Sequence, residues 1–456
     1  MEISWFVNQV KLLLRKIKMD RAVFFALMAR VCSGAIGLVT LFLIVRKFTP
    51  ELQGYYYTFY NLVALQIFVE LGLGTVIIQF ASHEWASLRF DEKGNVVGSA
   101  DALSRLISLA RISMRWYVTG GVILTFLLSI FGYLFFSKSH SVIVNWAGPW
   151  FVLCLFTGFN ILLVPLWSLL EGCNQVKNLY TYRFIQVVCS GLAVLAAILL
   201  GAGLWSLSFS TLAIFICAPI FLLRYYKKFL KILIFSIPLG SRISWKIEIF
   251  PMQWRIAVSW FSGYFVFCLF TPVLFHYQGP VVAGQFGMTW SLINVVGMVA
   301  TSWLVPRIPQ FGIFIAQKKY KELDKFFWKI TRIVSILIFL SSLIILFFIY
   351  IINKFNFPLA SRLLTPFVTA LLLIAQALVV FSMPFSSYLR AHKREPLMIL
   401  SVLSGLSIGF VTLLLSKYCT VREVAIGYLV VTVIIIPIIF IIWVRCKAIW
   451  HTINLT

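Results

Sequence analysis

Two opposite charges lie inside the first two long apolar runs of the chain, where a charged side chain is costly. The runs, residues 21–45 and 55–81, are each long enough to cross a bilayer as a helix, and they contain Arg30 and Glu70. At ~1.5 Å per residue, Arg30 lies about 13 Å and Glu70 about 16 Å from the same membrane surface. A charge at that depth costs at least about 2.5 kcal/mol and normally faces a protein interior or a water-filled cavity. We therefore interpret Arg30 and Glu70 as candidate partners in a cavity.

These two side chains favour two kinds of chemistry. A guanidinium ion in a hydrated cavity can bind an anionic group. A carboxylate beside Gly72 and Gly74, where the helix can bend or approach a neighbour closely, can hold a proton or a sodium ion for coupling. A purely structural pairing of Arg30 with Glu70 is the alternative.

The composition is that of an all-α integral membrane protein. Of the 456 residues, 61% are hydrophobic and 12% are charged. The formal net charge of +25 would suggest nucleic acid in a soluble protein, but here Lys and Arg collect in short segments between apolar runs. We therefore expect no nucleic-acid partner. The first apolar run leads straight into a second spanning run, so it is not expected to be a cleaved signal peptide.

No metal or cofactor motif is present in the sequence. The eight cysteines are scattered, mostly in apolar runs, and none lies in a CxxC pair, while the five histidines lack ligand partners at useful spacing. We interpret the cysteines as small buried hydrophobes and expect neither a cofactor nor a metal.

Twelve apolar runs of spanning length follow an amphipathic start. The expected spans are 21–45, 55–81, 116–136, 147–170, 179–200, 204–226, 252–275, 281–305, 327–352, 364–389, 397–416 and 423–444. They form two sets of six helices. The expected divisions are an interfacial amphipathic helix at 1–20, an N-terminal lobe at 21–226, a cytoplasmic linker at 227–250, a C-terminal lobe at 251–446 and a cytoplasmic tail at 447–456.

The positive charges predict the orientation. When the loops are assigned alternately to the two sides, 31 of the 39 Lys and Arg fall on one side and seven on the other, with Arg30 left inside a span. Because cytoplasmic loops carry the excess of Lys and Arg, both termini are expected in the cytoplasm.

A faint internal repeat supports two related halves. A shift of 230 positions places Pro50 on Pro280 and Gly54 on Gly284, and a shift of 219 places Pro165 on Pro384. Repeated halves are common in transporters whose binding site lies near the midplane. Glu70 falls on Ala300 in this repeat, so its role is expected in one half only.

The order of elements resembles the polysaccharide-transporter flippases, also called Wzx-type O-antigen flippases, of the superfamily that includes the multidrug and toxin extruders (MATE). The resemblance rests on RVCSGAIG in the first span, FTPELQGYY leading into ELGLGTVIIQFAS in the second, and LLEGCNQVKNLY after the fourth. It implies two six-helix lobes around a central cavity that opens alternately to each face. It also implies a bacterial inner-membrane protein that moves an oligosaccharide linked through pyrophosphate to a polyprenyl carrier.

That substrate assigns expected roles to named residues. Arg30, Arg255 and Arg307 are the candidates for pyrophosphate binding, and Glu70 is the candidate for H+ or Na+ coupling. For Arg255 and Arg307, which lie at helix ends, the alternative is contact with lipid headgroups. The expected partners are the lipid-linked oligosaccharide, membrane lipids and the enzymes of polysaccharide assembly.

Two other functions remain as alternatives. A multidrug or cation antiporter of the sister family would need a cavity rich in carboxylates, and an interior Arg30 argues against it because it repels cations. A membrane glycan polymerase or glycosyltransferase would need catalytic acids facing a substantial loop, whereas only one of the 14 acids lies deep in an apolar run. The chain is therefore not expected to be an enzyme.

Overall fold

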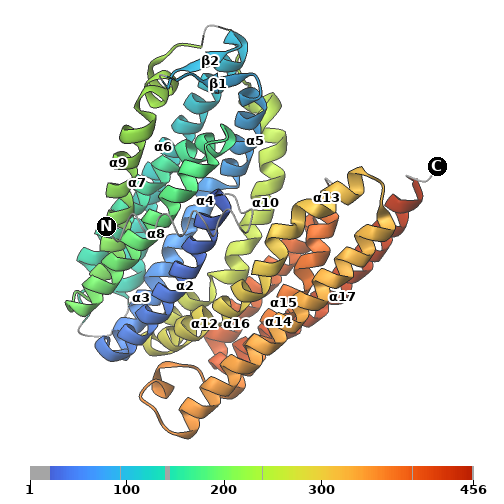
Figure 1. The fold of residues 1–456 in the computed structure, drawn as a ribbon. Helices are drawn as coiled ribbons and strands as arrows, with labels where there is room; N and C mark the ends of the chain where they lie inside the picture. Colours follow the sequence, from blue (N-terminus) through green and yellow to red (C-terminus); the bar gives the residue numbers. More distant parts are fainter. Residues whose placement is uncertain (1–20, 93, 139–143, 239, 393, 454–456) are drawn as a thin grey trace, which may run out of the picture. The chain divides into compact units, whose positions relative to one another are not determined.

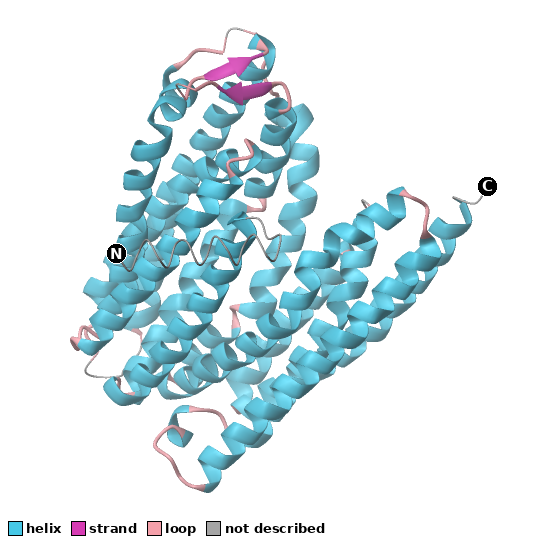
Figure 2. Cartoon of the chain, viewed as in Figure 1, coloured by secondary structure: helices cyan, strands magenta, loops and turns pink. Residues whose placement is uncertain are grey.

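The chain folds almost entirely into long helices in a computed structural model, which describes residues 21–92, 94–138, 144–238, 240–392 and 394–453 (Figures 1 and 2). The helices of its first half are α2 (Arg21–Lys47), α3 (Pro50–Val63), α4 (Ile67–Glu70), α5 (Leu73–Trp85), α6 (Ala100–Ser137), α7 (Ala147–Gly172), α8 (Val176–Leu199) and α9 (Trp205–Phe235). Those of the second half are α10 (Phe250–Phe267), α11 (Phe270–Gln278), α12 (Pro280–Leu304), α13 (Ile308–Ala316), α14 (Tyr320–Lys354), α15 (Pro366–Ala391), α16 (Met398–Tyr418) and α17 (Val421–Ile453). Short helical turns lie at η1 (Ala64–Gln66), η2 (Trp245–Ile249), η3 (Val305–Arg307) and η4 (Ala360–Arg362).

The expected number of membrane spans is confirmed. Among the described residues, ten helices are long and apolar enough to cross a membrane, and two bent pairs bring the number to twelve. The two bent spans are Pro50–Glu70 with Leu73–Trp85, and Trp245–Phe267 with Phe270–Gln278. The all-α membrane architecture therefore follows from the apolar runs.

Local sequence signals explain where several helices begin and end. Thr49 caps α3, because its hydroxyl accepts a hydrogen bond from the Leu52 amide at 3.2 Å, and Pro50 follows at the first helical position. Ser99 caps α6 in the same way. At the other end of α2, Arg46 and Lys47 complement the negative end of the helix dipole.

The second span is broken, as Gly72 and Gly74 suggested. Leu71 and Gly72 have φ of 41° and 68°, in the left-handed region, and the two parts of the span meet at 44°. Gly74 follows the break at a close approach, because a Cβ placed there would lie 3.1 Å from the Ser168 hydroxyl. Glu70 is thus the last residue of α4, directly before the break.

Contacts divide the chain differently from the expected linear boundaries. One compact unit contains the described parts of residues 1–48, 65–138 and 145–257, and the other contains residues 49–64, Val144 and the described part of 258–456. The segment α3 therefore groups with the second unit, where it packs against α12. The expected linker 227–250 groups with the first unit, because it lies along α6 and is hydrogen-bonded to it.

Two further boundaries differ from expectation. The helix α6 begins at Ala100, 16 residues before the expected span, because its polar, charged first part continues the same helix. The helix α17 runs to Ile453, so most of the expected tail at 447–456 is helical. The expected interfacial helix at 1–20 and residues 454–456 lie outside the described residues.

A short hairpin that the apolar pattern did not indicate follows α5. Its strands β1 (Leu88–Phe90) and β2 (Val96–Gly98) are antiparallel, with Leu88 opposite Gly98. The turn is closed by Asp91, whose carboxylate accepts a hydrogen bond from the Asn95 amide at 2.6 Å.

Candidate functional site

Arg30 lies on the exposed side of a helix that the rest of the chain barely covers. Only 6% of the apolar window of α2 is buried, and its main packing partner is α8. The Arg30 side chain is exposed, and its charge acts on the hydroxyl of Tyr180 at the start of α8. The guanidinium therefore acts electrostatically on the first part of α8.

That turn carries an ion pair. Glu171, at the end of α7, binds Arg183 of α8 through Oε2 and Nη2 at 2.8 Å, and Tyr180 donates to Oε1 of the same carboxylate at 3.4 Å. The Arg183 guanidinium also lies over the Tyr180 ring, with Cζ 5.0 Å from its centre. Together with Arg30, these residues form a group with two positive charges and one negative charge, which we call the Arg30 cluster.

The predicted pairing of Arg30 with Glu70 is wrong. Within the described residues, neither side chain forms an ion pair with the other. Arg30 belongs to the α2–α8 side of the first unit, whereas α4 contacts α6. Equal depth along two helices fixes the height of each residue, but not the face on which it lies.

Glu70 instead lies on the end of α4, which is hydrogen-bonded to α6. The Trp116 indole N–H donates to the Val69 carbonyl at 2.9 Å, which ties α4 to α6. Gly120 permits this approach, since a Cβ there would lie 2.6 Å from Val69 Cγ1. Glu70 is partly buried and interacts electrostatically with the buried Tyr117. A carboxylate at a helix break is therefore placed next to a tyrosine hydroxyl.

An apolar cavity of about 540 Å³ adjoins this helix break. It lies along α6 from Trp116 to Phe131 and is closed on one side by Leu65, Phe68 and Val69. Its walls are almost entirely hydrocarbon and aromatic, so it suits an apolar group rather than an ion.

The two other predicted pyrophosphate-binding residues, Arg255 and Arg307, lie on other helices, far from these groups in the sequence. Arg307 forms a local helix-end contact: Nη1 donates to the Trp303 carbonyl at 2.8 Å, and Cζ lies 3.7 Å from the centre of the Trp303 ring. Its side chain is partly exposed. Arg255 lies on α10, and its side chain is outside the described residues. In the described part of the chain, no group of three or more His, Cys, Asp and Glu is placed to hold a metal ion.

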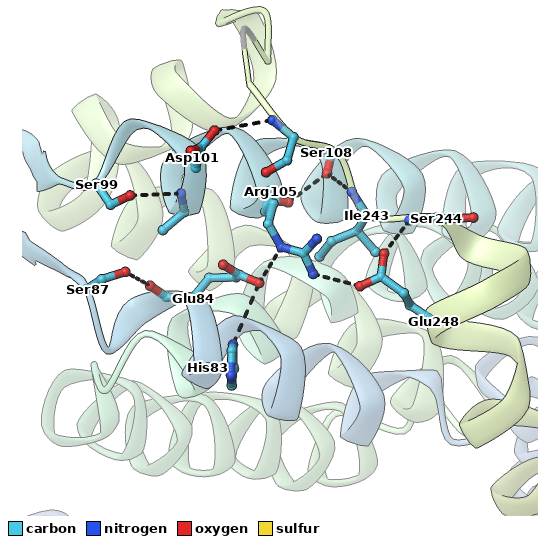
Figure 3. A network of polar contacts seen from close by, with 12 residues as sticks. His83, Glu84, Ser87, Ser99, Asp101, Arg105, Ser108, Ile243, Ser244 and Glu248 are labelled. Atoms are coloured by element: carbon cyan, nitrogen blue, oxygen red, sulfur yellow. Dashed lines mark hydrogen bonds and ion pairs between the residues drawn. The ribbon is translucent and has the colours of Figure 1, made fainter.

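Figure 3 shows a polar network that sequence reasoning missed. Arg105 of α6 binds two carboxylates at once: Nε lies 2.7 Å from Glu84 Oε1, and Nη2 lies 2.7 Å from Glu248 Oε2. Both carboxylates come from other elements, α5 and η2. The signal in the sequence was the spacing of Asp101, Ser104, Arg105 and Ser108, which puts polar groups on one side of a helix longer than the membrane requires.

The comparisons with known proteins identify the fold. No protein-family profile and no curated protein matches the sequence. Solved structures do: an inward-facing multidrug resistance MATE family transporter of the MOP superfamily aligns over 93% of this chain and 98% of its own, with a TM-score of 0.64 and 13% identity. The chain has the MATE transporter fold.

Two more structures with this fold are similar. An outward-facing MATE multidrug transporter of the MOP superfamily aligns over 94% of this chain and 95% of its own, with a TM-score of 0.53 and 14% identity. A MOP superfamily transporter from Pyrococcus furiosus, whose reversed binding-pocket polarity suggests a different function, aligns over 94% of this chain and 95% of its own, with a TM-score of 0.58 and 13% identity. At these identities the likeness concerns the fold. The fold implied by the sequence resemblance, that of the MATE transporters, is thereby confirmed.

Proposed function

We propose that the protein is a flippase that moves polyprenyl-pyrophosphate-linked oligosaccharide, an O-antigen or related polysaccharide repeat unit, from the inner to the outer leaflet. It would work by alternating access in the bacterial inner membrane, with both termini in the cytoplasm. The observation that carries the proposal is the Arg30 cluster, because it places an exposed guanidinium within a membrane-spanning helix.

An exposed arginine at this depth is costly against lipid, so it is expected to face water and to bind an anion. Arg30 has no carboxylate within ion-pair distance among the described residues, and Arg183 adds a second positive charge nearby. Two guanidinium groups with one carboxylate leave a net positive charge, which suits a pyrophosphate dianion and disfavours a cationic drug.

The fold supports transport by alternating access. Proteins with this fold have been solved in inward-facing and outward-facing conformations. The reversed pocket polarity of the Pyrococcus furiosus protein shows that the fold accommodates pockets of different charge. The known neighbours are transporters, which agrees with a chain that is not an enzyme.

Glu70 is proposed as the coupling residue for H+ or Na+. It ends one half of a broken span, and broken spans with exposed backbone ends often form the ion sites of transporters. Its neighbour Tyr117 supplies a hydroxyl that can accept or donate a hydrogen bond as the carboxylate changes its proton or ion.

Arg255 and Arg307 are proposed to attract the anionic headgroup at the cytoplasmic entrance. Arg307 stays partly exposed in its local contact with Trp303, so its charge remains accessible to a headgroup. Enzymes of polysaccharide assembly are the proposed protein partners.

Reconstituted vesicles distinguish this function from its rivals. The purified protein is incorporated into vesicles that contain a fluorescent polyprenyl-pyrophosphate-linked oligosaccharide, and the sugar exposed on the opposite leaflet is measured with a lectin. We expect protein-dependent movement of the lipid-linked sugar. If the lipid-linked sugar is not moved but a cationic dye is exported, the protein is a multidrug antiporter instead of a flippase. The formation of new glycosidic bonds would instead indicate a polymerase or transferase.

A further inference from the structure

The end of α9 and the segment that follows it form a strap on the first unit, described at residues 224–238 and 240–249. Within α9, Tyr226 leaves helical geometry with φ of −131° and ψ of 17°, so the helix is kinked at that residue, before its last turns. The inner side of the strap is buried at Phe229, Leu233, Ile243 and Ile249. The Phe229 ring lies 5.4 Å from the Phe90 ring of the hairpin. The strap therefore has a defined inner face.

Hydrogen bonds to α6 fix the inner face in place. The amides of Gly240 and Ile243 donate to the hydroxyls of Ser104 and Ser108, both at 2.9 Å. Arg111 donates from Nη2 to the Ser236 carbonyl at 2.7 Å.

The far end of the strap is held as well. Glu248 binds Arg105, and Trp245 stacks on Trp116 with ring centres 5.2 Å apart (Figure 3 shows the Glu248 contact). These contacts anchor the strap to α6 at its middle and at its far end, and they leave its other face exposed.

That outer face combines exposed apolar side chains with cations. Phe235 is 73% exposed, Ile237 67% and Ile247 78%, which is unusual for large apolar residues outside a membrane. The exposed cations of the strap are Arg224, Lys227, Lys228, Lys231, Arg242 and Lys246. Its only acid, Glu248, is the one bound to Arg105.

We propose that the outer face of the strap binds an anionic membrane surface, with phospholipid phosphates on the cations and the apolar side chains among the headgroups. Interfacial segments combine cations with large apolar side chains in this way, and clusters of four to eight cations next to a span attract anionic lipids. The strap is also continuous with α9, a span, so it lies within reach of the membrane surface. A nucleic acid or an acidic protein would match the cations but would leave Phe235, Ile237 and Ile247 without apolar contacts. The proposal does not depend on the transported substrate.

The test uses the full chain, with its eight native cysteines replaced and one cysteine introduced by Ile237→Cys, labelled with an environment-sensitive dye. Vesicles are made of phosphatidylcholine alone or with added phosphatidylglycerol, and part of each lipid is brominated. We expect a blue-shifted emission and stronger quenching by brominated lipid when phosphatidylglycerol is present.

Two sets of variants test whether the response to anionic lipid depends on the strap cations or on any exposed cations of the protein. The triple change Lys227→Gln, Lys228→Gln and Lys231→Gln should remove most of the response to phosphatidylglycerol. The matched control, Lys321→Gln, Lys325→Gln and Lys329→Gln, removes three exposed charges from α14 and should leave the response intact. All six positions are exposed, so folded protein is expected, and its helix content is checked by circular dichroism.

A second pair of changes tests the apolar half of the proposal. Phe235→Ser with Ile247→Ser should reduce quenching in both lipid mixtures while the charge-dependent difference persists in part. The proposal is overturned if the dye at position 237 stays equally water-exposed in both mixtures. It is also overturned if the control triple lowers the response as much as the strap triple, or if the dye responds to an added nucleic acid or acidic protein and not to the lipid.

Discussion

Gly54 and Gly284 pack backbone against backbone, and the two residues occupy equivalent positions in the repeat. A Cβ on Gly54 would lie 1.9 Å from the Pro280 carbonyl oxygen, and one on Gly284 would lie 2.9 Å from the Gly54 amide nitrogen. The shift of 230 positions aligns these two glycines in the sequence, and in the structure they are also in contact. The helices α3 and α12 thus meet where each carries the glycine that the repeat aligns.

Replacing Gly54 by alanine should destabilise the protein. The added methyl group meets backbone atoms that cannot move aside as a side chain can, so we expect a loss of about 1–3 kcal/mol, seen as a lower Tm in detergent. Gly37→Ala is the matched control, because nothing lies within 4 Å of a Cβ there, and it should leave the Tm unchanged or slightly raised. Equal Tm values for both variants would contradict the tight contact.

The Arg105 network should contribute more to stability than an exposed arginine on the same helix. Arg105→Ala leaves the carboxylate of Glu84, whose side chain is 7% exposed, without its charge partner. We expect a loss on the order of 3 kcal/mol by thermal unfolding, because an unpaired buried charge is costly. Arg115→Ala, at an exposed position of α6, should change the Tm little. The loss of Tm for Glu248→Gln should lie between those of the two arginine variants, since Glu84 keeps its contact with Arg105.

Arg30→Gln should weaken binding of the lipid-linked oligosaccharide by about tenfold or more, because it removes a charged hydrogen bond to the pyrophosphate. Binding is measured with the purified protein and a short-chain analogue of the lipid. The control, Arg46→Gln, changes an exposed arginine at the other end of α2, where Cζ lies 4.5 Å from the Phe42 ring centre. Unchanged binding by Arg30→Gln, with loss by Arg46→Gln, would reject the assigned role.

The exchange Arg30→Glu with Glu70→Arg provides a further check on the same residues. Because the two side chains are not paired in the structure, the swap should restore neither binding nor stability. Full recovery in the double variant would show that the charges do interact directly.

Glu70→Gln should bind the lipid-linked oligosaccharide but lose its response to an imposed pH or sodium gradient. The amide keeps the shape of the carboxylate, so folding should persist, while the group can no longer exchange a proton or neutralise a cation. Transport is measured in vesicles with and without each gradient. Glu322→Gln changes an exposed acid of α14 and serves as the control. Gradient-driven transport that survives in Glu70→Gln would assign coupling to another residue.

Both termini and the strap should face the cytoplasm, as the 31 to 7 distribution of cations predicts. A single cysteine at position 236, in a chain without its native cysteines, is labelled in intact cells. An impermeant maleimide applied from outside should not react until the membrane is opened. Labelling of position 236 in intact cells would show that the protein has the opposite orientation.

The number of spans could be predicted from the apolar runs alone, because a bilayer needs about 20 apolar residues for each crossing and each run meets that length. The sequence also predicted the break after Glu70, since Gly72 can adopt a positive φ that most residues avoid. These features depend on neighbouring residues in the chain. The polar first part of α6 was missed because hydrophobicity reports where a helix crosses the membrane, not where the helix begins.

Which charged side chains meet could not be predicted from the sequence, because it depends on how the helices pack. Arg30 and Glu70 lie at similar depths, yet Arg30 lies beside Tyr180 and Glu70 beside Tyr117, because helix packing chooses the face that each residue presents. The grouping of α3 with α12 and of the strap with α6 likewise depends on contacts between residues far apart in sequence. Periodicity places side chains on one face of a helix, but the partner of that face is selected by the packing of the whole unit.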